Sequence, residues 1–385
     1  MLQEFLNNAP HYILPFIFVI SIVVFVHEFG HYWVARRCGI KIEAFSIGFG
    51  REIFGWTDKI GTRWKVCWLP FGGYVKMFGD SNPASMPGEE VKTMTPEEQK
   101  VAFYHQSVNK RMAVVVAGPA FNYIFAIIVL AILFVFQGMP YTAPDISTVV
   151  EKSAAEKAGL LKGDHVLSID GSTIDRFEDI KRIAVLNAGT PLAVTVERGG
   201  VPMQFTLTPD IVTMTDHFGG EHKVGRIGIT SDKLEYKKLS PPLALYYSVL
   251  ETWNMSAGAL KAMGQMIIGT RGTEELGGPL RIAEMSGHVA QDGFVSLMWF
   301  MGVISINLGL INLFPVPLLD GGHLAFYIIE KLRGRPLHER VQDAGMRVGM
   351  ALVLSLMVFS TWNDVFIHWG VLTWLRNGLA TLGSM

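Results

Sequence analysis

The chain has 385 residues, of which 50% are apolar and only 17% are charged, and its formal net charge is −1. This composition is too apolar for an ordinary soluble protein of that length, so a membrane protein is the first expectation. Because there is no basic excess to hold a phosphate backbone, nucleic acid is excluded as a partner. Two cysteines are too few for a disulfide framework.

Four stretches are long and apolar enough to cross a bilayer, which takes about 20 helical residues. They cover residues 12–34, 112–136, about 296–320 and about 348–369. The first has neither a basic segment before it nor a small-residue cleavage site after it, so we expect it to be retained in the mature chain. The fold class is therefore a polytopic α-helical membrane protein with four transmembrane helices.

The loops between these stretches differ in charge. Lys and Arg are concentrated in the loop between spans one and two and in the loop between spans three and four, close to the helix ends. By the positive-inside rule these two loops are cytoplasmic. Both termini and the segment from residue 137 to 295 are then expected on the outer side of the membrane.

The outer segment itself has two parts. Residues 145–209 alternate strand-like runs with turn signals, and "AGLLKGDHVLSIDG" (158–171) resembles a PDZ domain. PDZ domains bind a peptide as an added strand at a sheet edge, which would filter or dock substrates; the alternative is a spacer that only restricts access. Residues 210–295 are expected to form a linker with amphipathic helices, which lie at the membrane interface or pack under the PDZ domain.

The first span contains an unusual polar motif, "HEFGH". His27 and His31 are four residues apart, so on a helix they lie on one face and can bind the same metal ion. Glu28 is close enough to touch a water molecule at that ion. Two imidazoles and a glutamate at this spacing are typical of hydrolytic zinc sites.

A catalytic zinc ion needs a third protein ligand, and the best candidate is Asp320 in "INLFPVPLLDGGH" (311–323). Pro315 and Pro317 cannot continue a helix, so the chain unwinds or kinks there. Irregular backbone at membrane depth is tolerated only inside protein or beside a water-filled cavity. Asp320 and the two histidines are all expected near the cytoplasmic end of their spans, at a similar depth.

Three motifs occur in the order of a known family: "HEFGH", "AGPAFNYIFA" (117–126) and "NLFPVPLLDGGH" (312–323). With them the chain resembles the site-2 protease family of intramembrane zinc metalloproteases and is most similar to its RseP-type bacterial members. The resemblance covers nearly the whole chain. It departs in one respect, because RseP itself carries two PDZ domains and only one is found here.

The resemblance implies a role for particular residues. His27, His31 and Asp320 would bind one Zn²⁺ per chain, and Glu28 would be the catalytic base. Asn312 would hold the substrate or stabilise the oxyanion. Asn122, Pro315 and Pro317 would support the site, although Asn122 with Gly118 is equally well explained by helix packing.

A protease that cuts within a membrane must unwind a substrate helix, because the helix hides its peptide bonds in its own hydrogen bonds. "RWKVCWLPFGGYVKMF" (63–78) predicts a membrane-associated β-hairpin with its turn at "PFGG". We expect the second strand, formed by Tyr74, Val75, Lys76 and Met77, to pair with the unwound substrate. The alternative is a hairpin that only anchors the loop.

The predicted function is intramembrane zinc endopeptidase in a bacterial inner membrane. The resemblance implies single-span membrane substrates such as anti-sigma factors and remnant signal peptides, already trimmed outside the membrane by a site-1-type protease. The lipid bilayer is the remaining partner. Two alternatives from other classes are a zinc transporter, since buried His and Asp can line an ion path, and a non-catalytic PDZ membrane scaffold.

Overall fold

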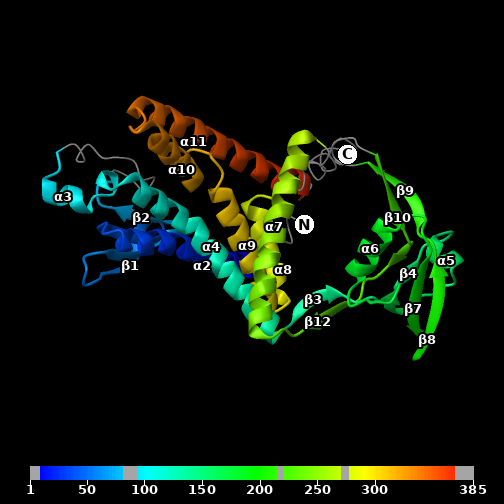
Figure 1. Cartoon of the computed structure of the whole chain (residues 1–385). Coiled ribbons are helices and arrows are strands. Elements are labelled where there is room, and N and C mark those ends of the chain that lie inside the picture. The colour runs from blue at the N-terminus through cyan, green and yellow to red at the C-terminus, as the bar shows by residue number, and fades with distance from the viewer. Residues whose placement is uncertain (1–8, 81–92, 216–220, 270–276, 369–385) are drawn as a thin grey trace, which may run out of the picture. The chain divides into compact units, whose positions relative to one another are not determined.

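The computed structural model describes residues 9–80, 93–215, 221–269 and 277–368 of the chain. The chain forms two compact units, labelled in Figure 1: a helical body made of residues 1–133 and 241–385, and a β domain made of residues 134–240. Each unit has its own hydrophobic core.

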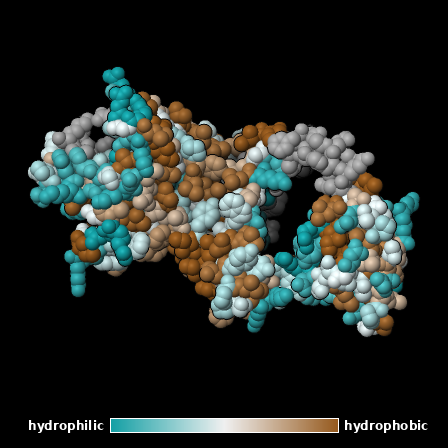
Figure 2. All heavy atoms as spheres, in the orientation of Figure 1, coloured by the Kyte–Doolittle hydropathy of each residue, from teal (hydrophilic) through white to brown (hydrophobic). Residues whose placement is uncertain are grey.

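Among the residues that the structure describes, four helices are long and apolar enough to cross a membrane, which is the number that the sequence predicts. They are α2 (Ala9–Arg37), α4 (Val108–Phe136), α9 (Phe294–Asn312) and α11 (Glu339–Trp362). Large apolar side chains are exposed on all four. Figure 2 shows a broad apolar area over the helical body, which is the kind of surface that lipid covers.

The bounds of the last two spans differ from the sequence prediction. α9 ends at Asn312 rather than near residue 320, because two prolines follow at 315 and 317 and disfavour helical backbone at and before them. α11 begins at Glu339 rather than near residue 348, since its first turns are exposed and tolerate the charges of Arg340 and Arg347. A π-helical turn, η4 (Asn363–His368), follows α11. The apolar stretch after residue 369 lies outside the described residues.

The segment between α2 and α4 contains a sheet of two long, bent strands, β1 (Ile42–Thr57) and β2 (Arg63–Met77). The turn between them is stabilised by Asp58, whose carboxylate accepts hydrogen bonds from the N–H groups of Ile60 and Thr62, each at 2.9 Å. Two short helices, α3 (Pro96–Val101) and η2 (Phe103–His105), lead into α4.

The strands bend so far that one part of β1 is paired on both sides. Residues 44–47 lie opposite residues 63–66 and also opposite residues 73–76 of β2. Residues 52–57 of β1 pair with 63–67. The segments are therefore ordered 52–57, 63–67, 44–47, 73–77, and the last of these is an edge of the sheet.

The predicted hairpin over residues 63–78 is wrong. The two halves of β2 do not pair with each other, because residues 44–47 of β1 lie between them. The tight turn is at Asp58 rather than at "PFGG", where Gly72 has a φ of 113° and lets the chain change direction. A run of aromatic and β-branched residues predicts a strand but not its partner, so the topology could not follow from composition.

Three more helices belong to the helical body: α7 (Pro241–Ile268), α8 (Pro279–Gln291) and α10 (Asp320–Arg333). α7 and α8 lie where the sequence predicts amphipathic helices. The Ser256 hydroxyl of α7 donates to the Tyr123 hydroxyl of α4 at 3.3 Å. The Asp364 carboxylate, after α11, accepts the N–H groups of Gly278 and Arg281 at 2.8 and 3.1 Å, so it caps the start of α8.

The β domain is built on a four-stranded antiparallel sheet. Its strands are ordered β6 (Ser172–Thr173), β5 (His165–Ile169), β7 (Leu192–Arg198) and β8 (Val201–Leu207). Helices α5 (Ala154–Lys157) and α6 (Phe177–Leu186) contribute to its core. Three further pairs join β4 (Thr148–Val149) to β11 (Ile229–Thr230), β9 (Asp210–Thr215) to β10 (Glu221–Arg226), and β3 (Met139–Thr142) to β12 (Leu234–Lys237).

These pairs make the domain larger than the predicted range of residues 145–209. The compact unit extends from 134 to 240, so the first part of the predicted linker belongs to it. The added residues belong to the domain because they pair with strands that are distant in the sequence. The two-residue strand β11 pairs with β4, and β12 pairs with β3, which lies near the other end of the domain's sequence. Strands this short have no periodicity that a sequence pattern could detect.

Candidate metal centre

Two histidines of α2 face inward, one helical turn apart. His27 and His31 are both buried, and their Nε2 atoms are 3.3 Å apart. The spacing of four residues places them on one face of the helix, as the sequence predicts. Gly30 lies where α2 packs against α4. The two helices are so close there that a side chain at position 30 would collide with the carbonyl group of Ala117.

One face of α4 supports both imidazole rings through residues spaced four apart. The Nδ1 atom of His31 donates to the carbonyl oxygen of Val114 at 2.8 Å. One turn later, Gly118 lies against the rings, and a Cβ atom there would be 2.6 Å from Cε1 of His31 and 2.9 Å from Cε1 of His27. One turn further, the Asn122 amide lies 3.2 Å from Nδ1 of His27.

The bond to Val114 fixes the tautomer of His31. With Nδ1–H of His31 bonded to a carbonyl oxygen, Nε2 keeps its lone pair for a metal ion. For His27 to do the same, its Nδ1–H must donate to Asn122. The Oδ1 atom of Asn122 is buried with no hydrogen-bond partner among the described residues, and turning the amide over brings this acceptor to the imidazole.

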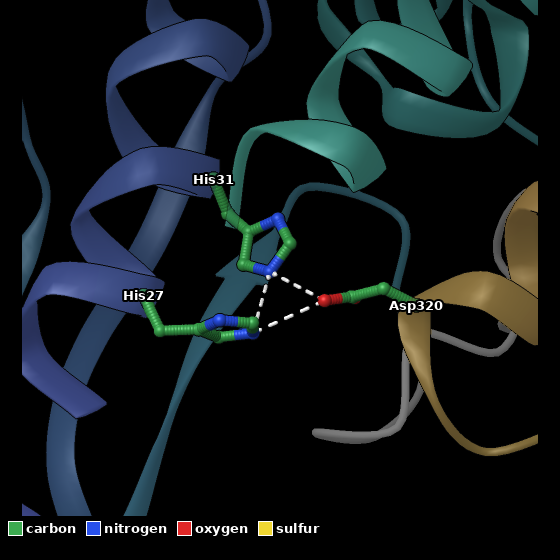
Figure 3. A group of neighbouring side chains, drawn as sticks. All are labelled: His27, His31 and Asp320. Carbon is green, nitrogen blue, oxygen red and sulfur yellow. Dashed lines mark hydrogen bonds and ion pairs between the residues drawn. The ribbon is translucent and has the colours of Figure 1, made fainter. Parts of the chain in front are cut away.

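Asp320 reaches the histidines from a tightly folded loop between α9 and α10. It is the first residue of α10, and Figure 3 shows its carboxylate pointing at the two rings. Leu318, just before it, has a φ of 97°, which is rare for a residue with a branched side chain. Gly321 and Gly322 pack on the backbone of this same loop, where any side chain would collide with Leu313, Phe314 or Val316.

The three ligand atoms form a nearly equilateral triangle. Oδ2 of Asp320 is 3.1 Å from Nε2 of His27 and 3.4 Å from Nε2 of His31, and the two nitrogens are 3.3 Å apart. Zinc bound tetrahedrally at about 2.0–2.1 Å places its ligand atoms roughly 3.3 Å from one another. Among the described residues this is the group of His, Cys, Asp and Glu side chains with metal-binding geometry.

The chemistry of the donor set also fits a divalent cation. Two neutral imidazoles present lone pairs to a buried carboxylate oxygen that has no hydrogen-bond donor among the described residues. Burying a carboxylate without a compensating charge is costly. A zinc ion at the centre of the triangle would compensate it and would leave a fourth coordination position open.

A cavity of about 260 Å³ opens beside this triangle. Glu28 lines it next to both histidines, and the backbone of Val75 hydrogen-bonds the Glu28 carboxylate. The edge segment of β2 forms one wall: a Cβ atom on Gly73 would be 3.1 Å from Cγ of Glu28. Glu28, the triangle of His27, His31 and Asp320, and a strand edge therefore share one cavity.

The sequence-predicted substrate residues divide into two groups. Asn312, Tyr74, Val75 and Met77 line the cavity. Lys76 does not line it, and its ammonium group pairs with Glu43 at 2.7 Å. Strand alternation puts the Lys76 side chain on the face opposite to Val75 and Met77, whereas Tyr74, on the same face as Lys76, still reaches the cavity.

The supporting residues predicted from sequence also lie in different places. Asn122 contacts His27, as described above. Pro317 packs under Gly349 of α11, where a Cβ atom would be 3.0 Å from Cβ of the proline. Pro315 lies in the loop before Asp320 and, like Pro317, is not part of the cavity wall.

Sequence reasoning missed several residues of the site. Val114 contacts His31 directly, and Tyr327 and Phe103 line the cavity. Gly118, expected only to pack helices together, lies against both imidazole rings. The four-residue spacing of Val114, Gly118 and Asn122 was the available signal for the α4 face. No comparable signal marks Tyr327 or Phe103, because an aromatic residue in a helix is usually explained by core packing.

The fold and the site together define a metallopeptidase whose centre lies among membrane-type helices. Residues 15–356 match the model of peptidase family M50. An Agrobacterium fabrum protein named "Putative zinc metalloprotease" is 44% identical over 359 residues, which cover 92% of this chain and 95% of that one. The metalloprotease MmpA of Caulobacter vibrioides is 35% identical over 377 residues, covering 92% and 95%. The chain therefore belongs to peptidase family M50, the site-2 protease family, and is a zinc metalloprotease.

A Rhizobium meliloti protein, also named "Putative zinc metalloprotease", is 42% identical over 365 residues and covers 94% of this chain and 98% of its own length. Among solved structures, the PDZ domain of an SdrC-like protein from Listeria monocytogenes is similar with 19% identity and a TM-score of 0.19, covering 24% of this chain and 90% of that one. That structural likeness is too slight to carry a conclusion about fold.

Proposed function

We propose that this protein is an intramembrane zinc endopeptidase that cuts single-span membrane proteins, with His27, His31 and Asp320 as ligands of one zinc ion and Glu28 as the general base. The observation that carries the proposal is the ligand triangle, with separations of 3.1, 3.3 and 3.4 Å, in the same cavity as the Glu28 carboxylate. Its neighbours are long apolar helices.

The chemistry divides between the metal and the chain. Bound zinc would polarise the scissile carbonyl group and lower the pKa of a water molecule beside it. Glu28 accepts a proton as the water oxygen bonds to the carbonyl carbon, and it delivers the proton to the amide nitrogen as the C–N bond breaks. Asn312, in the cavity wall, is placed to donate to the carbonyl oxygen as its negative charge develops.

The strand edge of β2 suits a substrate that must be unwound. Residues 73–77 are an edge of the sheet and line the cavity beside Glu28. An extended peptide paired there exchanges the hydrogen bonds of its own helix for bonds to a strand. Tyr74, Val75 and Met77 therefore belong to the proposed substrate-binding surface, while Lys76 contributes through its backbone alone.

The proposed orientation follows the distribution of basic residues. Arg36 and Arg37 end α2, six residues or fewer after His31, so the zinc site lies near the cytoplasmic side of a bacterial inner membrane. Both termini and the β domain are then periplasmic. In this position the β domain, as a PDZ domain, would exclude substrates with bulky ectodomains, so that anti-sigma-factor-type substrates and remnant signal peptides are cut after another protease has trimmed them.

The two rival functions are less well supported. A transporter needs polar groups along the full depth of the membrane, whereas the described residues bring His, Asp and Glu side chains together with metal-binding geometry in one group, that of His27, His31 and Asp320. A scaffold has no use for a glutamate beside a ligand triangle. Membership of a peptidase family supports the protease function over both rivals.

The substrate class can be tested with purified protein in detergent. Two versions of one tagged single-span substrate are compared: one with its complete folded ectodomain and one trimmed to the membrane boundary. The proposal expects cleavage of the trimmed version and at most slow cleavage of the complete one. If a soluble protein lacking a transmembrane helix is cut faster than the trimmed substrate, the proposed substrate class is incorrect.

A further inference from the structure

A buried ion pair joins the helices that carry the two halves of the metal site. Arg111 of α4 and Glu330 of α10 bond in a bidentate manner: Nη2 to Oε1 at 2.6 Å and Nη1 to Oε2 at 3.2 Å. Their side chains are only 9% and 13% exposed. Bidentate arginine–carboxylate pairs fix orientation as well as distance.

The arginine is held from three directions. Its Nε–H donates to the carbonyl oxygen of Gln106 at 3.2 Å, at the start of α4. Its guanidinium group stacks on the ring of Tyr327, 4.7 Å from the centroid. Tyr327 is buried, belongs to α10, and lines the cavity that contains the ligand triangle. The pair is therefore connected to the wall of the site.

Each partner lies on the same rigid helix as a part of the metal site. Arg111 is one turn before Val114, the residue that holds the His31 imidazole. Glu330 is on α10, which begins with Asp320 about 15 Å away along the helix axis. Any shift of α10 against α4 moves the carboxylate of Asp320 relative to the histidines.

We propose that Arg111 and Glu330 are positioning residues that set the distance between the third zinc ligand and the two histidines. This inference rests on the proposed ligand set. If either charge is removed, the other is left buried and uncompensated. α10 then shifts or tilts so that the remaining charge reaches water, and the ligand triangle opens.

The test uses the full-length protein in detergent micelles, stripped of metal and titrated with Co²⁺ while the visible absorption of bound cobalt is recorded. We expect Glu330→Gln and Arg111→Gln each to raise the Kd for Co²⁺ by about tenfold or more, the range seen when groups that orient metal ligands are removed. Arg111→Lys keeps the charge and should lose less. The single charge reversals Arg111→Glu and Glu330→Arg should each weaken Co²⁺ binding. The double variant that combines them restores an ion pair and should recover part of the lost affinity.

A matched control separates positioning from a general loss of a buried ion pair. Arg198 and Asp164 form a second bidentate pair, with two bonds of 2.7 Å, in the β domain. Arg198→Gln breaks it and should leave the Kd for Co²⁺ within about twofold of wild type, because this pair shares no partner with the metal site and belongs to a separate compact unit.

Two results would overturn the proposal in distinguishable ways. If His31→Ala binds Co²⁺ as wild type does, the ligand set itself is wrong. If His31→Ala loses the metal but Glu330→Gln and Arg111→Gln bind it as wild type does, the ligand set stands and the positioning role is refuted.

Discussion

Gly118 of α4 lies in direct contact with the imidazole of His31, with no space for a methyl group between them. A Cβ atom at this position would be 2.6 Å from Cε1 of His31 and 2.9 Å from Cε1 of His27. The close packing of α2 on α4 therefore determines the shape of the ligand triangle as directly as the ligands do.

We expect Gly118→Ala to lose most of its bound zinc, because the new methyl group must push both rings out of position. Zinc is measured by mass spectrometry of the purified protein. The matched control is Gly258→Ala in α7, a helix position with nothing within 4 Å of the added carbon. That variant should keep its zinc and gain up to about 1 kcal/mol of stability from helix propensity. Equal zinc contents in both variants would show that the contact at Gly118 is unimportant.

Asn122 should act on the metal through the tautomer of His27. Asn122→Leu removes the acceptor for Nδ1–H and should weaken zinc binding about 10- to 100-fold. Asn122→Asp keeps an acceptor oxygen beside the ring and should weaken it less. The Kd is measured by competition with a chelator. Asn307→Leu on α9, whose amide only bonds Val303 of its own helix, is the control. An unchanged Kd in Asn122→Leu would exclude this role.

Pairing of the substrate with the β2 edge predicts that Val75→Pro impairs substrate binding. Because the backbone of Val75 also bonds Glu28, cleavage alone cannot separate the two effects. Binding is therefore measured in the Glu28→Gln background by capture of a trimmed single-span substrate. We expect a loss of about tenfold or more for Val75→Pro, from the removed strand hydrogen bond and the rigid ring. Val75→Ala, which keeps the N–H group and loses only side-chain contacts, should lose much less. If the double variant Glu28→Gln/Val75→Pro binds the substrate as well as Glu28→Gln alone, pairing at this edge is ruled out.

The β domain should lose stability in acid through Asp164. Burial by itself would raise the pKa of this carboxyl, but the hydrogen bonds from Arg198 and the Leu161 N–H outweigh burial and hold the pKa below its ordinary value. A depressed folded-state pKa stabilises the fold above the unfolded pKa, about 3.9, and this contribution is lost as the pH falls through the folded value.

Asp164→Asn should therefore destabilise the domain at pH 7 by about 1–3 kcal/mol, the range for hydrogen bonds to charged groups. The difference from wild type should shrink as the pH falls below about 4, toward the folded-state pKa. This stability difference is measured by hydrogen exchange of strands β5 and β7 in the full-length protein. Variant and wild type are compared at each pH. A difference that is the same at pH 7 and in acid would contradict the assignment.

Local patterns were enough to predict the core of the site. "HEFGH" on an apolar helix predicts that His27 and His31 share one face with Glu28 beside them, because a spacing of four residues has one geometric meaning on a helix. Asp320 could be found because Pro315 and Pro317 mark irregular backbone at the depth where a third ligand is needed.

Features that depend on distant pairing could not be predicted. Nothing in residues 63–78 reveals that residues 44–47 lie between the two halves of β2. The two-residue strands β4 and β11 are found only in three dimensions. Gly118 was recognised as a packing residue, but its contact with the ligand imidazoles requires the crossing of α2 and α4, which the sequence of either helix alone does not fix.

The most direct test of the site measures zinc content and cleavage of a trimmed single-span substrate in the same preparations of wild type, Glu28→Gln and Asp320→Ala. We expect wild type to contain one zinc ion per chain and to cut, Glu28→Gln to keep the zinc and not cut, and Asp320→Ala to lose both. Cleavage by Glu28→Gln at the wild-type rate, or a full complement of zinc in Asp320→Ala, would contradict the assigned roles.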